Sequence, residues 1–296
     1  MKQAQLFHNP GAGGGEHDIE ELIASIKANG FECHYSSVKE KGWEEIKEGT
    51  DFLIIAGGDG TVKKVARMVL EKEIKLPLAL LPLGTANNVA VSLKLKDEKE
   101  EDIIRAWHHD KRIKYDTGKL TNAGEANFFF ESFGYGIFPH LITKMRKRKL
   151  KEPETPEQNI FSTLKMLEQV ISTYNAVDCR IAADGNDLSG KFFLAEIMLT
   201  RSIGPNLVLA PYSHLDDGVF DVVLLSESDK EKFAEQVSDK LNDKTDEKNF
   251  TTVKAKELTV NWAGTHVHAD DELIELIPDS EVKIEIMPGA LEFLIV

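Results

Sequence analysis

Several patterns that mark other protein classes are missing from this 296-residue sequence. Only two cysteines occur, Cys33 and Cys179, and they lie far apart, so the sequence predicts neither a disulfide framework nor a cysteine-based metal site. No apolar run approaches the roughly 18–20 residues that cross a bilayer. No basic segment leads into an apolar stretch at the N-terminus, so we expect no signal peptide. We therefore expect a cytoplasmic protein, with peripheral association at the inner membrane face as the alternative.

Positive charge is also scarce. The chain has 36 Lys and Arg against 50 Asp and Glu, a formal net charge of −14. Because nucleic-acid binding needs a basic surface, this balance excludes a general nucleic-acid-binding protein. One segment, from Lys144 to Lys151 (KMRKRKLK), is strongly basic although the chain as a whole is acidic. It is either a solvated helix end or a basic patch for an anionic membrane or phosphorylated substrate, where each nearby Lys or Arg contributes about 1 kcal/mol.

The length is sufficient for two domains, each with its own core. Up to about residue 120, strand and helix signals alternate, which is typical of βαβ units and an open, mostly parallel sheet. Residues 52–56 (FLIIA) form a continuous apolar run, as in a strand buried on both faces. Apolar residues recur at helical spacing from Ile19 to Ile26. The expected strands are at residues 3–8, 31–36, 52–56 and 78–81. One helix is expected to start near residues 16–18, and two others to span residues 62–70 and 88–93.

After residue 120, short strands separated by turns dominate, for example the turns at residues 184–187 (DGND) and 288–289 (PG). This alternation is typical of an antiparallel sandwich or barrel. We predict an α/β domain over residues 1–121 and an antiparallel β-sandwich domain over residues 122–296, with a return of the last strand to the first domain left open. The expected elements are strands at residues 127–133, 177–183, 191–200, 219–225, 257–260, 265–269, 273–276 and 282–287, and helices at 159–174 and 229–241.

The strongest functional signal is the turn Gly57-Gly58-Asp59-Gly60-Thr61, which follows the buried strand and opens a helix. Glycines let backbone N–H groups approach an anion closely, and a helix N-terminus adds unpaired donors and a positive dipole end. Asp59 places a carboxylate at the sheet edge where open α/β sheets bind ligands. The alternative is a tight strand–helix turn in which Asp59 caps the helix.

Two further turns follow strands and precede helices in the same way. Residues 82–88 (PLGTANN) offer Thr85 and Asn87 as donors and acceptors, with helix capping by Thr85 or Asn88 as the alternative. Residues 9–15 (NPGAGGG) form a glycine-rich turn that is a weak signal alone. No G-x-x-x-x-G-K-[ST] motif occurs, so none of the three is a P-loop. Three polar turns at one edge of a sheet nevertheless predict a phosphate site.

Together these turns resemble the diacylglycerol kinase catalytic domain family, which is related to NAD kinases and 6-phosphofructokinases. The likeness continues beyond the first domain, and covers nearly the whole chain in order. It includes Asp116, residues 215–221 (LDDGVFD), residues 268–272 (HADDE) and residues 288–291 (PGAL). The resemblance implies a kinase whose ATP, with Mg²⁺, lies between the two domains, because phosphoryl transfer needs charge neutralisation and positioning.

The resemblance also implies roles for individual residues. Asp270 is expected to act as general base on the acceptor hydroxyl, and Asp59 to organise the metal and acceptor. The expected nucleotide-binding residues are Asn9, Gly57, Gly58, Gly60, Thr61, Gly84, Thr85, Asn87 and Glu272. Bacterial relatives carry a separate structural metal, and its ligands here would be the carbonyls of His214 and Val219 and the carboxylate of Asp217, oxygen donors that suit Mg²⁺ or Ca²⁺.

Three positions depart from the family pattern. Asn88 stands where an aspartate is common, which removes a carboxylate from a magnesium network. Lys63 and Lys64 make the helix after Thr61 more positive. Asp271 replaces a glycine beside Asp270 and adds a charge there. These departures bear more on acceptor and metal than on nucleotide binding.

The resulting prediction is an ATP-dependent lipid kinase of phospholipid metabolism that acts on a hydroxyl such as that of diacylglycerol. The first alternative is a kinase of a soluble hydroxyl compound. The second is a nucleotide-binding regulator that has lost catalysis, which Asn88 and Asp271 favour. A homodimer and a membrane contact through the segment from Lys144 to Lys151 are left open.

Overall fold

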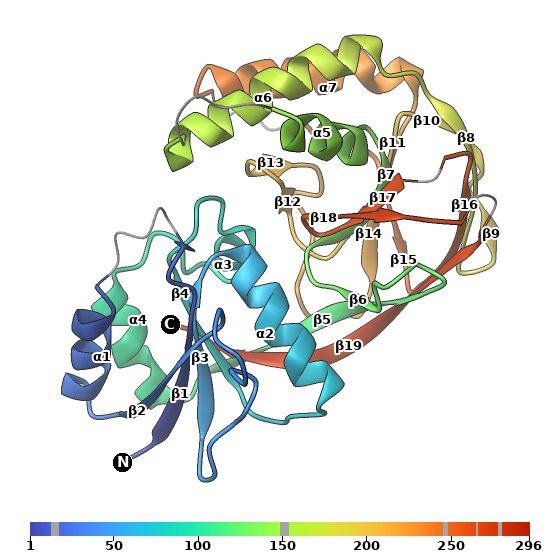
Figure 1. The fold of residues 1–296 in the computed structure, drawn as a ribbon. Coiled ribbons are helices and arrows are strands. Elements are labelled where there is room, and N and C mark those ends of the chain that lie inside the picture. Colours follow the sequence, from blue (N-terminus) through green and yellow to red (C-terminus); the bar gives the residue numbers. More distant parts are fainter. Residues whose placement is uncertain (13–17, 149–153, 245–247, 265, 278–279) are drawn as a thin grey trace. The chain divides into compact units, whose positions relative to one another are not determined.

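The computed structural model describes residues 1–12, 18–148, 154–244, 248–264, 266–277 and 280–296 (Figure 1). The chain divides into two compact units, one of Met1–Tyr115 with Gly289–Val296 and one of Asp116–Pro288. The chain passes between them within two strands, β5 (Arg112–Thr121) and β19 (Val282–Leu294). In the described ranges, no helix is long and apolar enough to cross a membrane.

The first unit is built on a parallel sheet. Its strands lie in the order β2–β1–β3–β4–β19, and each neighbouring pair is parallel. Every residue of β3 is buried, as expected for a strand covered on both faces. The predicted open, mostly parallel sheet is therefore confirmed. The strand bounds are β1 Gln3–His8, β2 Glu32–Ser37, β3 Phe52–Gly57 and β4 Leu78–Pro82.

Helices cover both faces of this sheet. The Asp18 side chain accepts hydrogen bonds from the N–H groups of Glu20 and Glu21, so the acidic start predicted for the first helix is confirmed at Asp18. Because β1 connects to β2 on one side and β3 to β4 on the other, right-handed crossovers put α1 and α2 on opposite faces, as Figure 1 shows. The bounds are α1 Ile19–Ala28, α2 Asp59–Glu71, α3 Asn88–Ser92, α4 Glu100–Ala106 and the 3-10 turn η2 Trp107–His109.

The strand order creates a switch point between β1 and β3. After β1 the chain moves outward to β2, and it then returns past β1 to form β3. Open α/β sheets bind ligands outside the carboxyl ends of the strands at such a point. The turns that follow β1 and β3 are therefore the ones that topology marks for a ligand.

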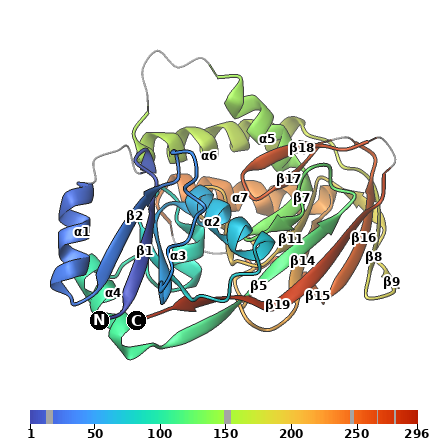
Figure 2. The ribbon, with the colours of Figure 1, turned by 60° about the horizontal axis from the view of Figure 1, so that its bottom comes forward.

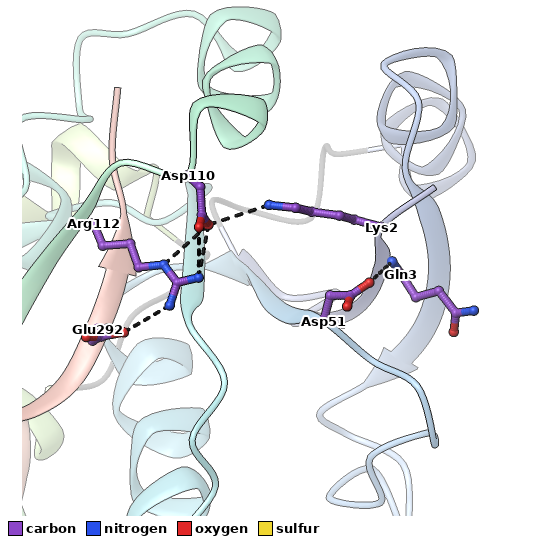
Figure 3. A network of polar contacts seen from close by, with 6 residues as sticks. All are labelled: Lys2, Gln3, Asp51, Asp110, Arg112 and Glu292. Carbon is purple, nitrogen blue, oxygen red and sulfur yellow. Dashed lines mark hydrogen bonds and ion pairs between the residues drawn. The ribbon is translucent and has the colours of Figure 1, made fainter.

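The opposite edge of this sheet carries a network of exposed ion pairs (Figure 3). Arg112 contacts Asp110 at 3.0 Å and Glu292 at 3.2 Å, and Lys2 lies 3.5 Å from the same Asp110. The Asp51 carboxylate accepts the N–H of Gln3 at the start of β1. Exposed pairs of this kind stabilise by about 0–1 kcal/mol. The network thus lies where β1, β3 and β5 begin, beside the carboxyl end of β19, and away from the ligand edge.

The second unit is an antiparallel sandwich with helices on one outer face (Figure 2). One sheet holds the strands β10–β8–β16–β19, with β9 beside β8 and β5 beside β6, and the other holds β15–β14–β11–β7–β17–β18. The predicted β-sandwich is confirmed. The strand bounds are β6 Phe128–Phe129, β7 Ser132–Gly136, β8 Val177–Ala183, β9 Asn186–Asp187, β10 Gly190–Phe192, β11 Leu194–Met198, β12 Ser202–Ile203, β13 Leu207–Val208, β14 Phe220–Leu225, β15 Thr252–Ala255, β16 Glu257–Trp262, β17 His266–Ala269 and β18 Glu272–Glu275.

The six-stranded sheet is buried on both faces. Along β11, Ala195 and Ile197 belong to the core between the sheets, whereas Leu194 and Met198 belong to a second core beneath the helices. This alternation follows from the two-residue period of a strand. A side chain of β11 that faces the helices is therefore as fully buried as one that faces the other sheet. The helices are α5 Ile137–Arg146, α6 Pro156–Thr173, η3 Glu227–Asp229 and α7 Lys230–Leu241.

Several predicted elements differ from the observed ones. The strand expected at residues 127–133 is divided at Phe130 and Glu131, and the one at 191–200 is divided at Phe193. The turn expected at residues 288–289 is instead inside β19, where Gly289 has a φ of 57°. The sequence did not indicate β5, α4, α5, β12, β13 or β15, and β9 lies within the turn expected at residues 184–187.

Candidate active site

The three turns singled out in the sequence all leave the carboxyl ends of parallel strands of the first unit, and backbone hydrogen bonds tie them together. The N–H of Asn9, after β1, donates to the carbonyl of Ala56 at 3.1 Å. The N–H of Leu83, after β4, donates to the carbonyl of Gly57 at 3.0 Å. The turn after β3 is thus held between its two neighbours.

Asn9 and Thr61 form a side-chain contact across the switch point. The Asn9 amide donates from Nδ2 to the Thr61 hydroxyl at 3.2 Å, and its Oδ1 accepts the N–H of Gly11. Thr61 is 3% exposed. A Cβ at Gly57 would lie 2.4 Å from the Thr61 oxygen, so only glycine at residue 57 leaves room for this hydroxyl. The sequence prediction that these residues act together is consistent with this contact.

The turns after β3 and β4 approach each other through glycine backbones. A Cβ on Gly84 would lie 2.3 Å from the Cα of Gly58, and a Cβ on Gly58 would lie 2.8 Å from the Cα of Gly84. Both distances are far below a van der Waals contact, so neither position accepts a side chain without movement of the backbone. Glycine backbones carry no side chain that would keep an anion at a distance, so this close packing suits an anionic ligand.

Asp59 joins the same two turns in a way that the sequence did not indicate. Its carboxylate accepts the N–H of Asn88 at 3.0 Å and that of Val89 at 3.1 Å, so it caps the neighbouring helix α3. The capping alternatives considered from sequence are therefore wrong: the N-cap of α2 is Gly58, with no side-chain cap, and neither Thr85 nor Asn88 caps α3.

The loop after β4 is closed by Asn87. This residue has a left-handed backbone with a φ of 55°, which asparagine tolerates better than most residues. Its Oδ1 accepts the N–H of Gly84 at 3.0 Å, and its Nδ2 donates to the carbonyls of Gly84 and Pro82. Asn87 is thus turned toward its own loop, whereas Thr85 is exposed.

The edge formed by these turns has features that suit a bound anion. The first N–H groups of a helix have no carbonyl partner within it, and α2 begins in this edge with Gly60 exposed. Lys64 is directed elsewhere, because its ammonium donates to the carbonyl of Val38 and lies 4.7 Å from the centre of the Trp43 ring. Residues 13–15 of the first turn lie outside the described residues. The described residues of the edge fit an anionic ligand.

Asp270, the expected base, lies in the second unit at the end of β17. It has a φ of 54° and is 8% exposed. Its Oδ1 accepts the N–H groups of Phe130, Glu131 and Ser132 at 3.0, 2.7 and 3.2 Å, and the N–H of Phe130 also lies 3.3 Å from Oδ2. Charge-assisted bonds of this kind offset the burial of a carboxylate. The break between β6 and β7 thus exists where three amides converge on Asp270.

Two buried charged side chains lie beside Asp270, and the sequence analysis missed both. The His268 ring contacts the Glu196 carboxylate through Nε2 at 3.0 Å and the Asp270 carbonyl through Nδ1 at 2.7 Å, and both side chains are fully buried. Burial alone would lower the pKa of His268, but the Glu196 carboxylate beside it raises that pKa above its ordinary value. A glutamate within the apolar run of residues 192–199 was the one available signal, and it does not identify the partner.

The acidic turn after β13 is arranged around Asp116 and Lys254. The Asp116 carboxylate accepts the N–H of Gly218 at 2.7 Å. Lys254 lies 2.7 Å from Asp217 and 3.4 Å from Asp221. Partial burial alone would lower the pKa of Lys254, but the two carboxylates raise it. The proposed metal ligand Asp217 is thus paired with an ammonium, and this arrangement does not fit an additional divalent cation.

The pairing of Lys254 with Asp217 and Asp221 predicts that removal of the Lys254 ammonium lets these carboxylates bind a cation. We expect Mg²⁺ or Ca²⁺ to leave the melting temperature of the wild-type second unit unchanged, and Lys254→Met to lower it. Millimolar Ca²⁺ should then restore stability, because a cation that binds only the folded state stabilises it by about 2.7 kcal/mol at 100 times its Kd. Lys191→Met is the control, since Lys191 reaches only the exposed Asp178 at 3.8 Å. A wild-type protein that Ca²⁺ already stabilises would contradict this assignment.

The remaining residues predicted from the sequence lie in the second unit. Glu272 begins β18 and pairs with Ala269, and His214 is exposed in the acidic turn. Of the basic segment, Lys144 to Arg146 close α5 and Arg148 is paired with Glu154, while residues 149–151 lie outside the described residues.

Comparison with known proteins agrees with the two-unit architecture. The model of the diacylglycerol kinase catalytic domain matches residues 3–120. The model of the YegS C-terminal NAD kinase beta sandwich-like domain matches residues 151–295.

Curated relatives carry the name of the same family, and a solved structure shares the fold. Proteins named diacylglycerol kinase from Staphylococcus aureus strains MRSA252 and Newman are each 27% identical over 237 residues, which is 77% of this chain and 71% of the relative. A crystal structure of a diacylglycerol kinase from Bacillus anthracis str. Sterne is similar with a TM-score of 0.75 and 20% identity, covering 100% of this chain and 97% of that one. At that identity the structure shows a shared fold alone. The catalytic-domain and sandwich matches follow one another along the sequence, and residues 3–120 belong to the diacylglycerol kinase catalytic domain family.

Proposed function

We propose that the protein is an ATP-dependent lipid kinase that transfers the γ-phosphoryl group of ATP to a lipid hydroxyl such as that of diacylglycerol. One observation carries the proposal: three polar turns meet at the switch point of a parallel sheet, and two of them touch through glycine backbones. Family membership supports the kinase reaction, and the names of the Staphylococcus aureus relatives support the lipid acceptor.

The nucleotide is proposed to bind at this edge of the first unit. The backbones of Gly58 and Gly60 face the phosphates, since glycine admits close approach and α2 contributes its positive end. Asn9 and Thr61 hold the turn in place through their hydrogen bond. Mg²⁺ carried by ATP neutralises charge on the phosphates. Asp59 fixes the relative position of the turns after β3 and β4 through its two bonds to α3.

Asp270 is proposed to orient and deprotonate the acceptor hydroxyl. A carboxylate in this role acts by accepting the hydroxyl proton as phosphoryl transfer proceeds. The three amides that hold Oδ1 keep the carboxylate in one orientation.

The same three bonds favour one second candidate, a nucleotide-binding regulator without turnover. If Asp270 serves only to hold the amides of residues 130–132, its role is structural. Asp271, exposed beside it, adds a second charge at the position where the family has glycine.

A direct assay separates the candidates. Purified protein is given ATP and Mg²⁺ with vesicles containing diacylglycerol, with other lipid alcohols, or with soluble alcohols, and phosphorylated product is measured beside nucleotide binding. Phosphorylated diacylglycerol formed on vesicles supports the proposal. Product from soluble acceptors alone would redirect it to a soluble substrate, and saturable ATP binding with no product from any acceptor would favour the regulator.

A further inference from the structure

Glu196, Gly134 and His268 form one row across three strands of the six-stranded sheet. Gly134 of β7 is the register partner of Glu196 on β11 and of His268 on β17. Side chains directly opposite on adjacent strands are neighbours, whereas those two strands apart are normally separated by the side chain between them. Because residue 134 is glycine, the two outer side chains meet across it.

The space above Gly134 is filled completely by the Glu196 carboxylate. A Cβ at residue 134 would lie 2.0 Å from Oε2 and 2.5 Å from the carboxyl carbon. The row faces the helical side of the sheet, because its alternate neighbours Ala195 and Val267 belong to the core between the sheets. On that side the ring of Phe138 lies edge-on to His268, with 6.2 Å between centroids. The pair is therefore enclosed by glycine on one side and an aromatic ring on the other.

The contacts determine where the protons of His268 lie. The Asp270 carbonyl is only an acceptor, so Nδ1 carries a proton and donates it at 2.7 Å. Nε2 lies 3.1 Å from Oε2 and 3.0 Å from Oε1 of Glu196. An ionised carboxylate is also only an acceptor, so with Glu196 ionised both ring nitrogens carry protons and His268 is an imidazolium. The raised pKa of His268, where the Glu196 carboxylate outweighs the effect of burial, agrees with this state.

The imidazolium holds the backbone of Asp270. That residue has a left-handed φ of 54°, a region that few non-glycine residues adopt and that aspartate tolerates better than most. Its N–H donates to the Ser132 carbonyl at 2.8 Å, its carbonyl accepts from His268, and its Oδ1 accepts three amides. Hydrogen bonds thus hold both the backbone and the side chain of Asp270. Without the histidine bond, the carbonyl loses the contact that sets the direction of the peptide after residue 270.

We infer that Glu196 and His268 are positioning residues, a buried ion pair that spans Gly134 and sets the orientation of the Asp270 carboxylate for phosphoryl transfer. The inference rests on the proposed function, because it assigns Asp270 as the base. Neither side chain is assigned a contact with substrate. Their effect is expected on turnover and not on nucleotide affinity, since the nucleotide turns belong to the first unit.

The test uses a double variant, Glu196→Leu with His268→Phe. Replacing both members of a buried ion pair by apolar residues of similar size is often neutral for stability, whereas removing one member leaves a buried charge. The double variant should fold, keep the KM for ATP within about twofold, and lose roughly tenfold to a hundredfold in kcat, since a shift near 1 Å of a catalytic group has that effect. Glu196→Gln, which retains a hydrogen bond to the ring, should keep most of the turnover.

A second measurement does not depend on activity. In wild-type protein labelled with ¹⁵N, the His268 ring should show two protected N–H signals at neutral pH, and the amide signals of residues 130–132 should shift in the double variant. Wild-type kcat in a folded double variant, or unshifted amides at residues 130–132, would overturn the inference. If Asp270→Asn retains full turnover, the assignment of the base fails instead, whatever the behaviour of the pair.

Discussion

Replacing Asp270 by asparagine is expected to reduce phosphoryl transfer by about a hundredfold to ten-thousandfold, the usual contribution of a general base. Asparagine tolerates a left-handed backbone, and its carbonyl oxygen can accept the amides of residues 130–132 as Oδ1 does. The change therefore removes the proton acceptor and preserves the fold. Steady-state rates with ATP and diacylglycerol vesicles, beside a thermal melt, measure both effects.

The matched variant is Asp270→Ala, which separates chemistry from structure. It leaves three buried amides without their acceptor, and each unsatisfied buried group costs about 1–3 kcal/mol. We expect Asp270→Ala to lower the free energy of unfolding clearly, and Asp270→Asn to lower it little. Full turnover in a folded Asp270→Asn protein would mean that the carboxylate serves only to hold the loop and is not the base.

Replacing Gly84 by alanine is expected to abolish tight nucleotide binding. The added Cβ would lie 2.3 Å from the Cα of Gly58, and an ordinary contact needs 3.4 Å or more, so the two turns must separate by about 1 Å. Overpacking of this kind costs about 1–3 kcal/mol of stability. A phosphate site that is widened by 1 Å should lose at least about tenfold in ATP affinity, which is 1.4 kcal/mol. Calorimetric titration with ATP and Mg²⁺ measures the loss.

Gly185→Ala is the control for the loss of a glycine as such. Gly185 has a φ of 80° in the turn between β8 and β9, and nothing lies within 4 Å of an added Cβ there. This variant should lose about 1 kcal/mol of stability through backbone strain alone and bind ATP normally. If Gly84→Ala binds ATP as well as Gly185→Ala does, the close approach of the two turns is not part of the nucleotide site.

Local sequence patterns predicted the first unit well. The apolar runs of β3 and β4 predicted buried parallel strands, because strands covered on both faces lose the polar alternation of an exposed sheet. The second unit was correctly predicted as an antiparallel sandwich, but its strand bounds were predicted less accurately than those of the first unit. The strand expected at residues 127–133 is interrupted because its amides turn to Asp270, a residue about 140 positions later. No local pattern encodes that bond.

The candidate site likewise combines features that the sequence indicated with contacts that only the tertiary structure reveals. Residue types at the ends of consecutive strands indicated Gly57, Gly58, Thr61 and Gly84 as one cluster, since parallel strands end at one edge. The sequence did not reveal that Asp59 caps α3, because that bond depends on the packing of two turns 29 residues apart. It also did not reveal that Lys254 pairs with the expected metal ligand Asp217.

By itself, then, the sequence determined the fold class, the glycine-rich turns at the sheet edge and the family resemblance, because these depend on residue type and short spacing along the chain. Only the tertiary structure decided which groups act on one another. Glu196 and His268 are 72 residues apart, and they meet because strand register places both opposite Gly134, which has no side chain to separate them. Register is set by the pairing of whole strands, so a pair of this kind appears only when the sheet is assembled.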